Sequence, residues 1–272
     1  MTDSPILIRT DNGVGWVTLN RPERRNAFDD RMIADLVRGL AALRGDGSVR
    51  AVVLRANGSS FSAGADLEWM KRMSLFGRKE NLADARELAT LMGVLAEMPK
   101  PTVALVQGAA LGGGAGLVAC CDIAIAADKA VFGFPEARLG LIPAVIAPFV
   151  VQAIGPRAAR RYFLTGERMD AVEALWLGLI HRVVPRARLE DALRDVLADL
   201  TACGPAAQAA VKDLVAAVSG RPPREALDDC ARRIAEVRSS AEGREGVTAF
   251  LERRPPAWRT GNGRIPAVPP RR

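Results

Sequence analysis

Two loops built from small residues offer the most obvious places for chemistry in this sequence. The first reads FSAGAD from Phe61 to Asp66, and the second reads ALGGGAG from Ala110 to Gly116. Each follows a strand-like apolar stretch and leads into a helical one. Small residues at a helix N-terminus leave backbone N–H groups unpaired and open to a ligand. Tight strand–helix packing would explain one such loop, but two of them favour an oxyanion hole with one N–H from each loop.

The histidine and cysteine content excludes several other kinds of site. His181 is the one histidine, so a multi-histidine metal site is excluded, and its place at the end of an apolar run indicates a packing role. The sequence has no GxxxxGK[ST] loop and no GxGxxG motif. We expect no metal site. The four cysteines form no CxxC pair and are Cys120, Cys121, Cys203 and Cys230. We expect the first two to be reduced thiols in the core.

The balance of charge is basic, with a formal net charge of +7 and a pI near 9.8. Attraction of an anionic small substrate is one interpretation, and an Arg-rich composition without functional meaning is another. Nucleic-acid binding is disfavoured because the arginines are scattered and aromatic residues make up 5% of the chain. No apolar run approaches the roughly 18 residues of a membrane span. The first residues lack the pattern of a secretory signal, so we expect a cytoplasmic protein.

Alternating and helical patterns divide the chain into an α/β part and a helical part. Residues 6–20 predict a hairpin turning at Asn12-Gly13, residues 51–56 a buried strand, and residues 80–97 a helix. Strands and helices alternate as far as about residue 186, and helical patterns follow. We therefore predict an α/β core over residues 1–195, a helical C-terminal region over 196–258 and a flexible tail over 259–272.

Several motifs, in this order, make the chain similar to the enoyl-CoA hydratase/isomerase (crotonase) superfamily. They are VTLNRPERRNAF, SFSAGADL, KPTVALVQGAALGGGAGL, CDIAIA and FGFPEARLGLIP. The resemblance implies a spiral of repeated ββα units with a helical C-terminal region that forms a homotrimer or hexamer. It also implies an acyl-CoA substrate, with CoA as part of that substrate and no separate cofactor.

The resemblance further implies roles for particular residues. The N–H groups of Ala65 and Gly113 would polarise the thioester carbonyl and stabilise the enolate oxygen. A second set would bind the CoA moiety, where exposed arginines could also be ordinary solvated surface. That set is Arg24, Arg25, Ala27, Ala63, Ala65, Asp66, Leu67 and Gly113.

The acid–base groups of this family are often two glutamates, and only one of them is present. Glu136, in the PE of FGFPEARLG, matches one position, and Gly116 stands at the other. A carboxyl at the mouth of an apolar acyl pocket has a raised pKa and can transfer a proton near neutral pH. Gly116 is compatible with a hydratase whose water is held by another group, with a double-bond isomerase, or with lost activity.

The finer resemblance favours the hydratase. The stretch from Gly112 to Ala126 looks like bacterial methylglutaconyl-CoA and isohexenylglutaconyl-CoA hydratases, which also have glycine at this place. Such a substrate, from leucine or isoprenoid catabolism, carries a distal carboxylate, for which Arg72 and Arg138 are candidate partners. The alternatives are an isomerase using Glu136 alone and a non-catalytic or RNA-binding protein of the same fold.

Overall fold

The computed structural model describes residues 4–259 and is built on a six-stranded sheet. Its first two strands form an antiparallel hairpin in which Ile6 pairs with Leu19 and Asp11 with Val14. The tight turn uses positive φ angles at Asn12 (48°) and Gly13 (78°), as the Asn-Gly pair predicts. The strands are β1 (Ile6–Asp11), β2 (Val14–Leu19), β3 (Ala51–Ala56), β4 (Thr102–Val106), β6 (Ile123–Ala127) and β9 (Arg182–Val184).

All pairs after the hairpin are parallel, in the order β1-β2-β3-β4-β6-β9. Parallel strands need long crossover connections, and here helices supply most of them. Because β3 and β4 are adjacent and parallel, the loops that follow them leave the sheet at the same edge. These are the two small-residue loops, so the topology itself brings them together.

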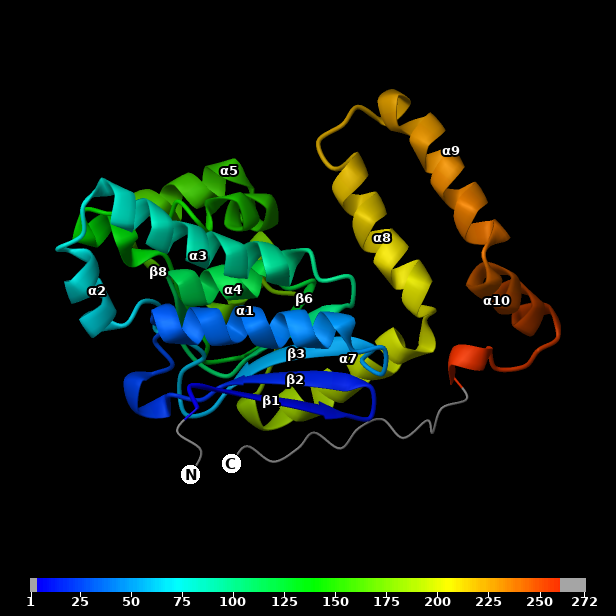
Figure 1. Cartoon of the computed structure of the whole chain (residues 1–272), viewed down its shortest axis with the longest axis horizontal. Coiled ribbons are helices and arrows are strands. Elements are labelled where there is room, and N and C mark those ends of the chain that lie inside the picture. The colour runs from blue at the N-terminus through cyan, green and yellow to red at the C-terminus, as the bar shows by residue number, and fades with distance from the viewer. Residues whose placement is uncertain (1–3, 260–272) are drawn as a thin grey trace.

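Helices cover both faces of this sheet. On one face, α1, α3 and α4 form a layer (Figure 1), and alternate strand residues such as Val52 and Leu54 join the larger apolar core there. On the other face, Val53 and Leu105 pack with α7 in a smaller core. The layering helices are α1 (Asp30–Gly45), α3 (Arg78–Ala96), α4 (Gly113–Cys120) and α7 (Leu189–Ala202). The helix predicted over 80–97 is therefore confirmed within two residues.

A second, smaller sheet stands beside the second glycine-rich loop. It consists of β5 (Ala110–Leu111), β7 (Val131–Gly133) and β8 (Arg168–Asp170) in the order β5-β7-β8. The remaining elements before residue 182 are α2 (Leu67–Met73), which follows the first small-residue loop, η2 (Pro135–Leu139), α5 (Ala147–Thr165) and α6 (Ala171–Leu177). In α5 the chain kinks at Gly155, where φ is +75°.

The C-terminal helices form an arm that extends away from the core in Figure 1. This arm comprises α8 (Pro205–Val218), α9 (Pro223–Ser239) and α10 (Ala241–Leu251). Three short 3-10 turns elsewhere in the chain are η1 (Pro22–Arg24), η3 (Arg186–Arg188) and η4 (Ala257–Arg259). A helical C-terminal region is thus present as expected. The boundary at 195/196 stays a prediction, and residues 260–272 of the predicted tail lie outside the described residues.

Within residues 4–259, no helix combines the length and apolarity that crossing a membrane requires.

Candidate functional site

The two small-residue loops lie side by side and are joined by backbone hydrogen bonds. The N–H groups of Phe61 and Ser62 both donate to Ala109 O, at 2.9 and 3.0 Å. Leu111 N–H donates in return to Ser62 O at 3.0 Å. Gly64 has φ +91°, and a Cβ there would lie 2.9 Å from Leu111 O. A larger residue would push the loops apart, which explains the small residues that the sequence places here.

Each loop presents one backbone N–H that the protein does not use. Ala65 lies opposite Phe28 in a parallel bridge, in which Phe28 N–H donates to Gly64 O and Asp66 N–H to Phe28 O. This pattern turns the N–H of Ala65 away from Phe28. Gly113 is the first residue of α4, where an N–H has no partner inside the helix. Across residues 4–259, neither N–H donates a hydrogen bond.

The phenyl ring of Phe28 packs against the backbone of Gly113, which carries the second of these N–H groups. A Cβ on Gly113 would lie 2.3 Å from Cζ of Phe28, so only glycine lets the backbone rest on the ring. Phe28 in turn contacts Trp69 of α2, with ring centroids 6.4 Å apart. The indole N–H of Trp69 donates to Asp84 of α3 at 2.9 Å. The apolar contacts and this hydrogen bond connect α2 and α3 to both loops.

The carboxyl group of Glu136 packs against the second loop. Gly112 has φ +52°, and a Cβ there would lie 3.0 Å from Glu136 Oε1. Gly112 N–H donates to Gly133 O at 2.9 Å, which ties the loop to the strand just before Glu136. Glu136 Oε2 is buried and has no hydrogen-bond partner among the described residues. Burial raises the pKa of this carboxyl, while its own backbone N–H opposes the shift.

A buried carboxyl oxygen without a partner is costly for stability and is a recurring mark of functional sites. Here it stands beside the loop that carries one of the two free N–H groups. The arrangement can therefore bind a carbonyl oxygen at the N–H groups and exchange a proton next to it.

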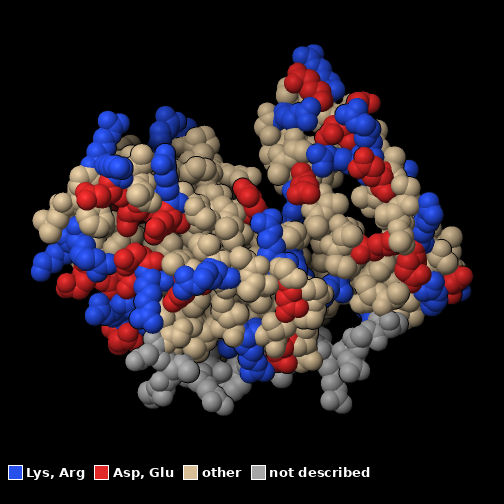
Figure 2. Space-filling view, in the orientation of Figure 1, with Lys and Arg blue, Asp and Glu red and all other residues tan. Residues whose placement is uncertain are grey.

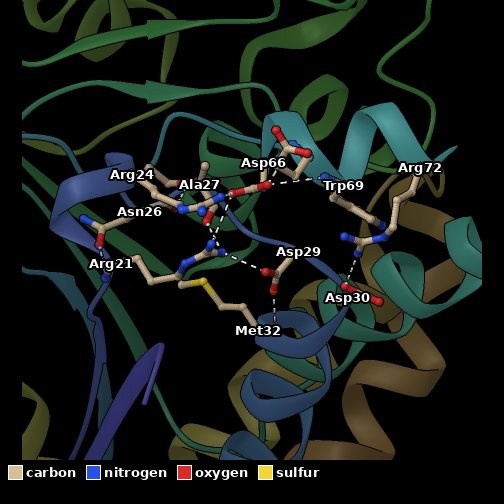
Figure 3. A network of polar contacts seen from close by, with 12 residues as sticks. Arg21, Arg24, Asn26, Ala27, Asp29, Asp30, Met32, Asp66, Trp69 and Arg72 are labelled. Atoms are coloured by element: carbon tan, nitrogen blue, oxygen red, sulfur yellow. Dashed lines mark hydrogen bonds and ion pairs between the residues drawn. The ribbon is translucent and has the colours of Figure 1, made fainter. Parts of the chain in front are cut away.

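Asp66, the residue after Ala65, holds the first loop in place (Figure 3). Its side chain is 4% exposed and accepts the N–H groups of Glu68 and Trp69 as the N-cap of α2. It also pairs with Arg21 at 3.1 Å and Arg24 at 3.0 Å. Burial alone would raise the pKa of Asp66, but the hydrogen bonds and Arg21 outweigh it and lower the pKa.

The segment predicted to contact CoA lies against this loop as a unit. Ala63 N–H donates to Arg25 O at 2.9 Å, and Ala27 is buried next to Phe28. Leu67 is 79% exposed at the start of α2. The structure thus brings the predicted CoA residues together with Ala65 and Gly113, and their contact with CoA stays a prediction. Arg24 is 49% exposed, and its guanidinium pairs with Asp66 in this structure.

The space next to Gly116 is filled by an apolar side chain. A Cβ on Gly116 would lie 2.2 Å from Cγ2 of Ile146 and 3.5 Å from Cε of Met92. Among the described residues, the atoms nearest to this position belong to Ile146 and Met92, and both side chains are apolar. No sequence pattern distinguishes Ile146, because it stands in an apolar stretch that is typical of ordinary core. Arg21 and Asp84 were missed for a similar reason, since their partners are distant in sequence.

The other singled-out residues have structural partners. Arg72 pairs with Asp30 at 2.8 Å, and Arg138 Nε donates to Thr165 O at 3.3 Å. His181 Nδ1 accepts the N–H of Ala124, which agrees with the packing role expected for it. Cys120 and Cys121 are buried free thiols whose pKa is raised by burial. The described part of the chain contains no cluster of potential metal ligands.

Comparison with known proteins gives a consistent result. Residues 9–261 match the family described as enoyl-CoA hydratase/isomerase. A putative enoyl-CoA hydratase of Thermus thermophilus is 36% identical over 93% of this chain and 100% of its own length. (E)-benzylidenesuccinyl-CoA hydratase of Thauera aromatica is 31% identical over 94% and 99%.

Solved structures agree. An enoyl-CoA hydratase from Shewanella pealeana superposes with a TM-score of 0.92 at 44% identity, over 94% of this chain and 97% of the other. Pseudomonas aeruginosa AtuE gives 0.89 at 44% identity, over 94% and 99%. The fold is therefore the crotonase fold, and the chain belongs to the enoyl-CoA hydratase/isomerase family.

Proposed function

We propose that this protein adds water across the double bond of an α,β-unsaturated acyl-CoA. The observation that carries the proposal is the buried Oε2 of Glu136, which has no hydrogen-bond partner among the described residues and belongs to a carboxyl beside Gly112, near the free N–H groups of Ala65 and Gly113. The names of the two sequence relatives given above, a putative enoyl-CoA hydratase and (E)-benzylidenesuccinyl-CoA hydratase, support the same reaction type.

Each part of that reaction is assigned here to a group in the site. The thioester oxygen accepts the N–H groups of Ala65 and Gly113, which stabilise the negative charge as the enolate forms; each donor is worth about 3 kcal/mol. The ionised Glu136 takes a proton from the water whose oxygen bonds to Cβ. It then returns that proton to Cα, so that the elements of one water are added. The chain uses no redox chemistry for this step.

For the acyl group, we propose a branched or glutaconyl-type chain such as that of 3-methylglutaconyl-CoA. One relative supports a second carboxylate, because benzylidenesuccinyl-CoA by its name has a carboxylated acyl group. Arg72 and Arg138 remain the candidate partners for it, and both would have to exchange a present contact with Asp30 or Thr165. The CoA moiety would lie along residues 24–27 and 63–67.

We also propose that the active form is a homotrimer or hexamer. The arm exposes large apolar side chains that the single chain leaves uncovered, including Val211 (55%), Leu227 (66%) and Phe250 (81%). Exposed apolar surface of this kind marks protein interfaces. On the face shown in Figure 2, blue and red side chains alternate without a single-sign stripe, which supports a small acyl-CoA as partner over nucleic acid.

The deciding experiment is an assay with crotonyl-CoA and 3-methylglutaconyl-CoA, followed by mass analysis of the product. The expected result is a product heavier by one water, formed faster from the glutaconyl ester. A product of unchanged mass would instead identify a double-bond isomerase, which Gly116 and the apolar Ile146 beside it would favour. Water addition to crotonyl-CoA alone would retain the hydratase and remove the glutaconyl proposal.

A further inference from the structure

Two side chains of the segment after β7 contact glycines at the start of α4. Gly112, the residue before the helix, and Gly116 are four residues apart, and Gly116 N–H donates to Gly112 O at 3.0 Å. The carboxyl of Glu136 lies against Gly112, and the side chain of Ile146 lies against Gly116. Glu136 and Ile146 therefore contact two backbone positions that one hydrogen bond joins.

The contact at Gly116 leaves room for only one side chain. A Cβ at position 116 would lie 2.2 Å from Cγ2 and 2.8 Å from Cβ of Ile146. Both distances are far below ordinary van der Waals contact. Ile146 itself is 2% exposed and is the residue just before α5, so it cannot swing into solvent without moving that helix. Positions 116 and 146 are thus sterically coupled, and here position 146 holds the side chain.

We propose that Ile146 is a specificity-determining residue of the acyl site, which rests on the acyl-CoA function proposed above. Its side chain forms an apolar wall at Gly116, four residues from the glycine that Glu136 contacts, in the room that a side chain at 116 would need. The wall limits the bulk that the acyl chain carries on this side of its reacting carbons. It also keeps position 116 free of a second proton-transfer group.

Binding of saturated acyl-CoA thioesters tests the wall without requiring turnover. Calorimetry would compare butyryl-CoA with 3,3-dimethylbutyryl-CoA, whose extra methyl groups lie at the carbon where water would add. In Ile146→Ala, the affinity ratio should move about tenfold toward the bulkier ester, because pockets discriminate about that much per methyl-sized group. Ile180→Ala, in a similarly buried isoleucine between α6 and β9, should leave the ratio unchanged. An unchanged ratio in Ile146→Ala would overturn the proposal.

Thermal unfolding separately tests the steric coupling between positions 116 and 146. Gly116→Ala should lower Tm by about 5 °C when Ile146 is present, because overpacking a core is destabilising. The same change should have little effect in an Ile146→Gly background. The Gly116→Glu variant should fold and bind acyl-CoA only when Ile146→Gly is also present. Additive effects of the two substitutions would show that position 146 does not control position 116.

The two proposals fail in different ways. If the wild-type protein hydrates no enoyl-CoA but the binding ratio shifts in Ile146→Ala, the proposed reaction is wrong and the acyl wall stands. If the wild-type protein hydrates crotonyl-CoA and the ratio stays constant, the reaction stands and Ile146 is ordinary core.

Discussion

At the scale of single residues, Glu136 is where stability and chemistry oppose each other. Its Oε2 is buried without a partner, and burial raises the pKa of the carboxyl. A protein that needed only a stable core would have an apolar residue or a hydrogen-bonded amide here. The nearby N–H groups of Ala65 and Gly113 likewise have no hydrogen-bond partner among the described residues. Together they indicate a site shaped for a ligand carbonyl.

Replacing this carboxyl by the isosteric amide should remove proton transfer and little else. We expect Glu136→Gln to lower kcat by at least about 100-fold with KM nearly unchanged, since general acid–base catalysis contributes that much or more. Steady-state kinetics on the best enoyl-CoA would measure it. Glu97→Gln, in an exposed glutamate at the end of α3, serves as the control and should behave like the wild type. A fully active Glu136→Gln would remove Glu136 from the reaction.

The same residue predicts how stability changes with pH. Because the folded-state pKa of Glu136 is raised, the folded chain holds a proton that the unfolded chain releases. This contribution to stability is complete below the pKa of an ordinary glutamate, about 4.3. It is lost as the pH rises from there through the raised folded-state pKa. Glu136→Gln should therefore have a higher Tm than the wild type at pH 8, and the difference should shrink toward pH 4. Parallel curves at all pH values would contradict the shift.

At the scale of elements, the loop that carries Ala65 depends on the capping of α2. Asp66 caps this helix and neutralises Arg21 and Arg24 while almost fully buried. The helix is short, at seven residues, so its own hydrogen bonds hold it weakly. Its position is set instead by Asp66, by the Trp69–Asp84 hydrogen bond and by the Arg72–Asp30 ion pair.

Removing the cap should therefore affect both folding and chemistry. Asp66→Ala should lower the free energy of unfolding by about 3 kcal/mol, because it deletes an N-cap and removes one of the two carboxylates that pair with the largely buried Arg21. Asp66→Asn keeps a capping oxygen and should lose about half as much. Denaturant titration measures both. Equal losses for the two variants would show that the ion pairs, rather than the cap, hold the loop.

The elements themselves were largely predictable from the sequence, and the site only in part. The Asn-Gly turn, the buried strand at 51–56 and the two small-residue loops are local patterns, and the structure confirms them. Ile146 and Asp84 were not predictable, because each matters through a contact with a residue distant in the chain. Periodicity shows which face of a helix is buried, but not which partner it meets there.

At the scale of the whole molecule, the arm is attached to the core by a few polar contacts. Lys212 pairs with Asp122 at 2.7 Å, and Asp122 also accepts the backbone N–H of Thr102. Arg50 donates to Cys203 O at 2.7 Å. The helices beyond these anchors present Val247, Phe250 and other apolar side chains to solvent. A single chain gains little from such a surface, which agrees with the proposed assembly.

Sedimentation would test that assembly directly. We expect a species of three or six times the 29.0 kDa of one chain. Substituting Phe250→Asp and Val247→Asp in α10 should shift the population to smaller species, because charge would be buried at the interface. Glu245, which pairs with Arg254 within the same chain, offers a control in Glu245→Gln that should keep the assembly. A monomeric wild-type protein would refute the proposed trimer.

The crowding between Gly116 and Ile146 also constrains how such a site can change over evolutionary time. Any side chain gained at position 116 would overlap Ile146. A lineage that acquires an acid there must first lose the side chain at 146, since the opposite order passes through an overpacked and destabilised ancestor. A site with glycine at 116 and isoleucine at 146 is therefore separated from a site with an acid at 116 by two substitutions in a set order. The first of them, the loss of the Ile146 side chain, adds no acid–base group.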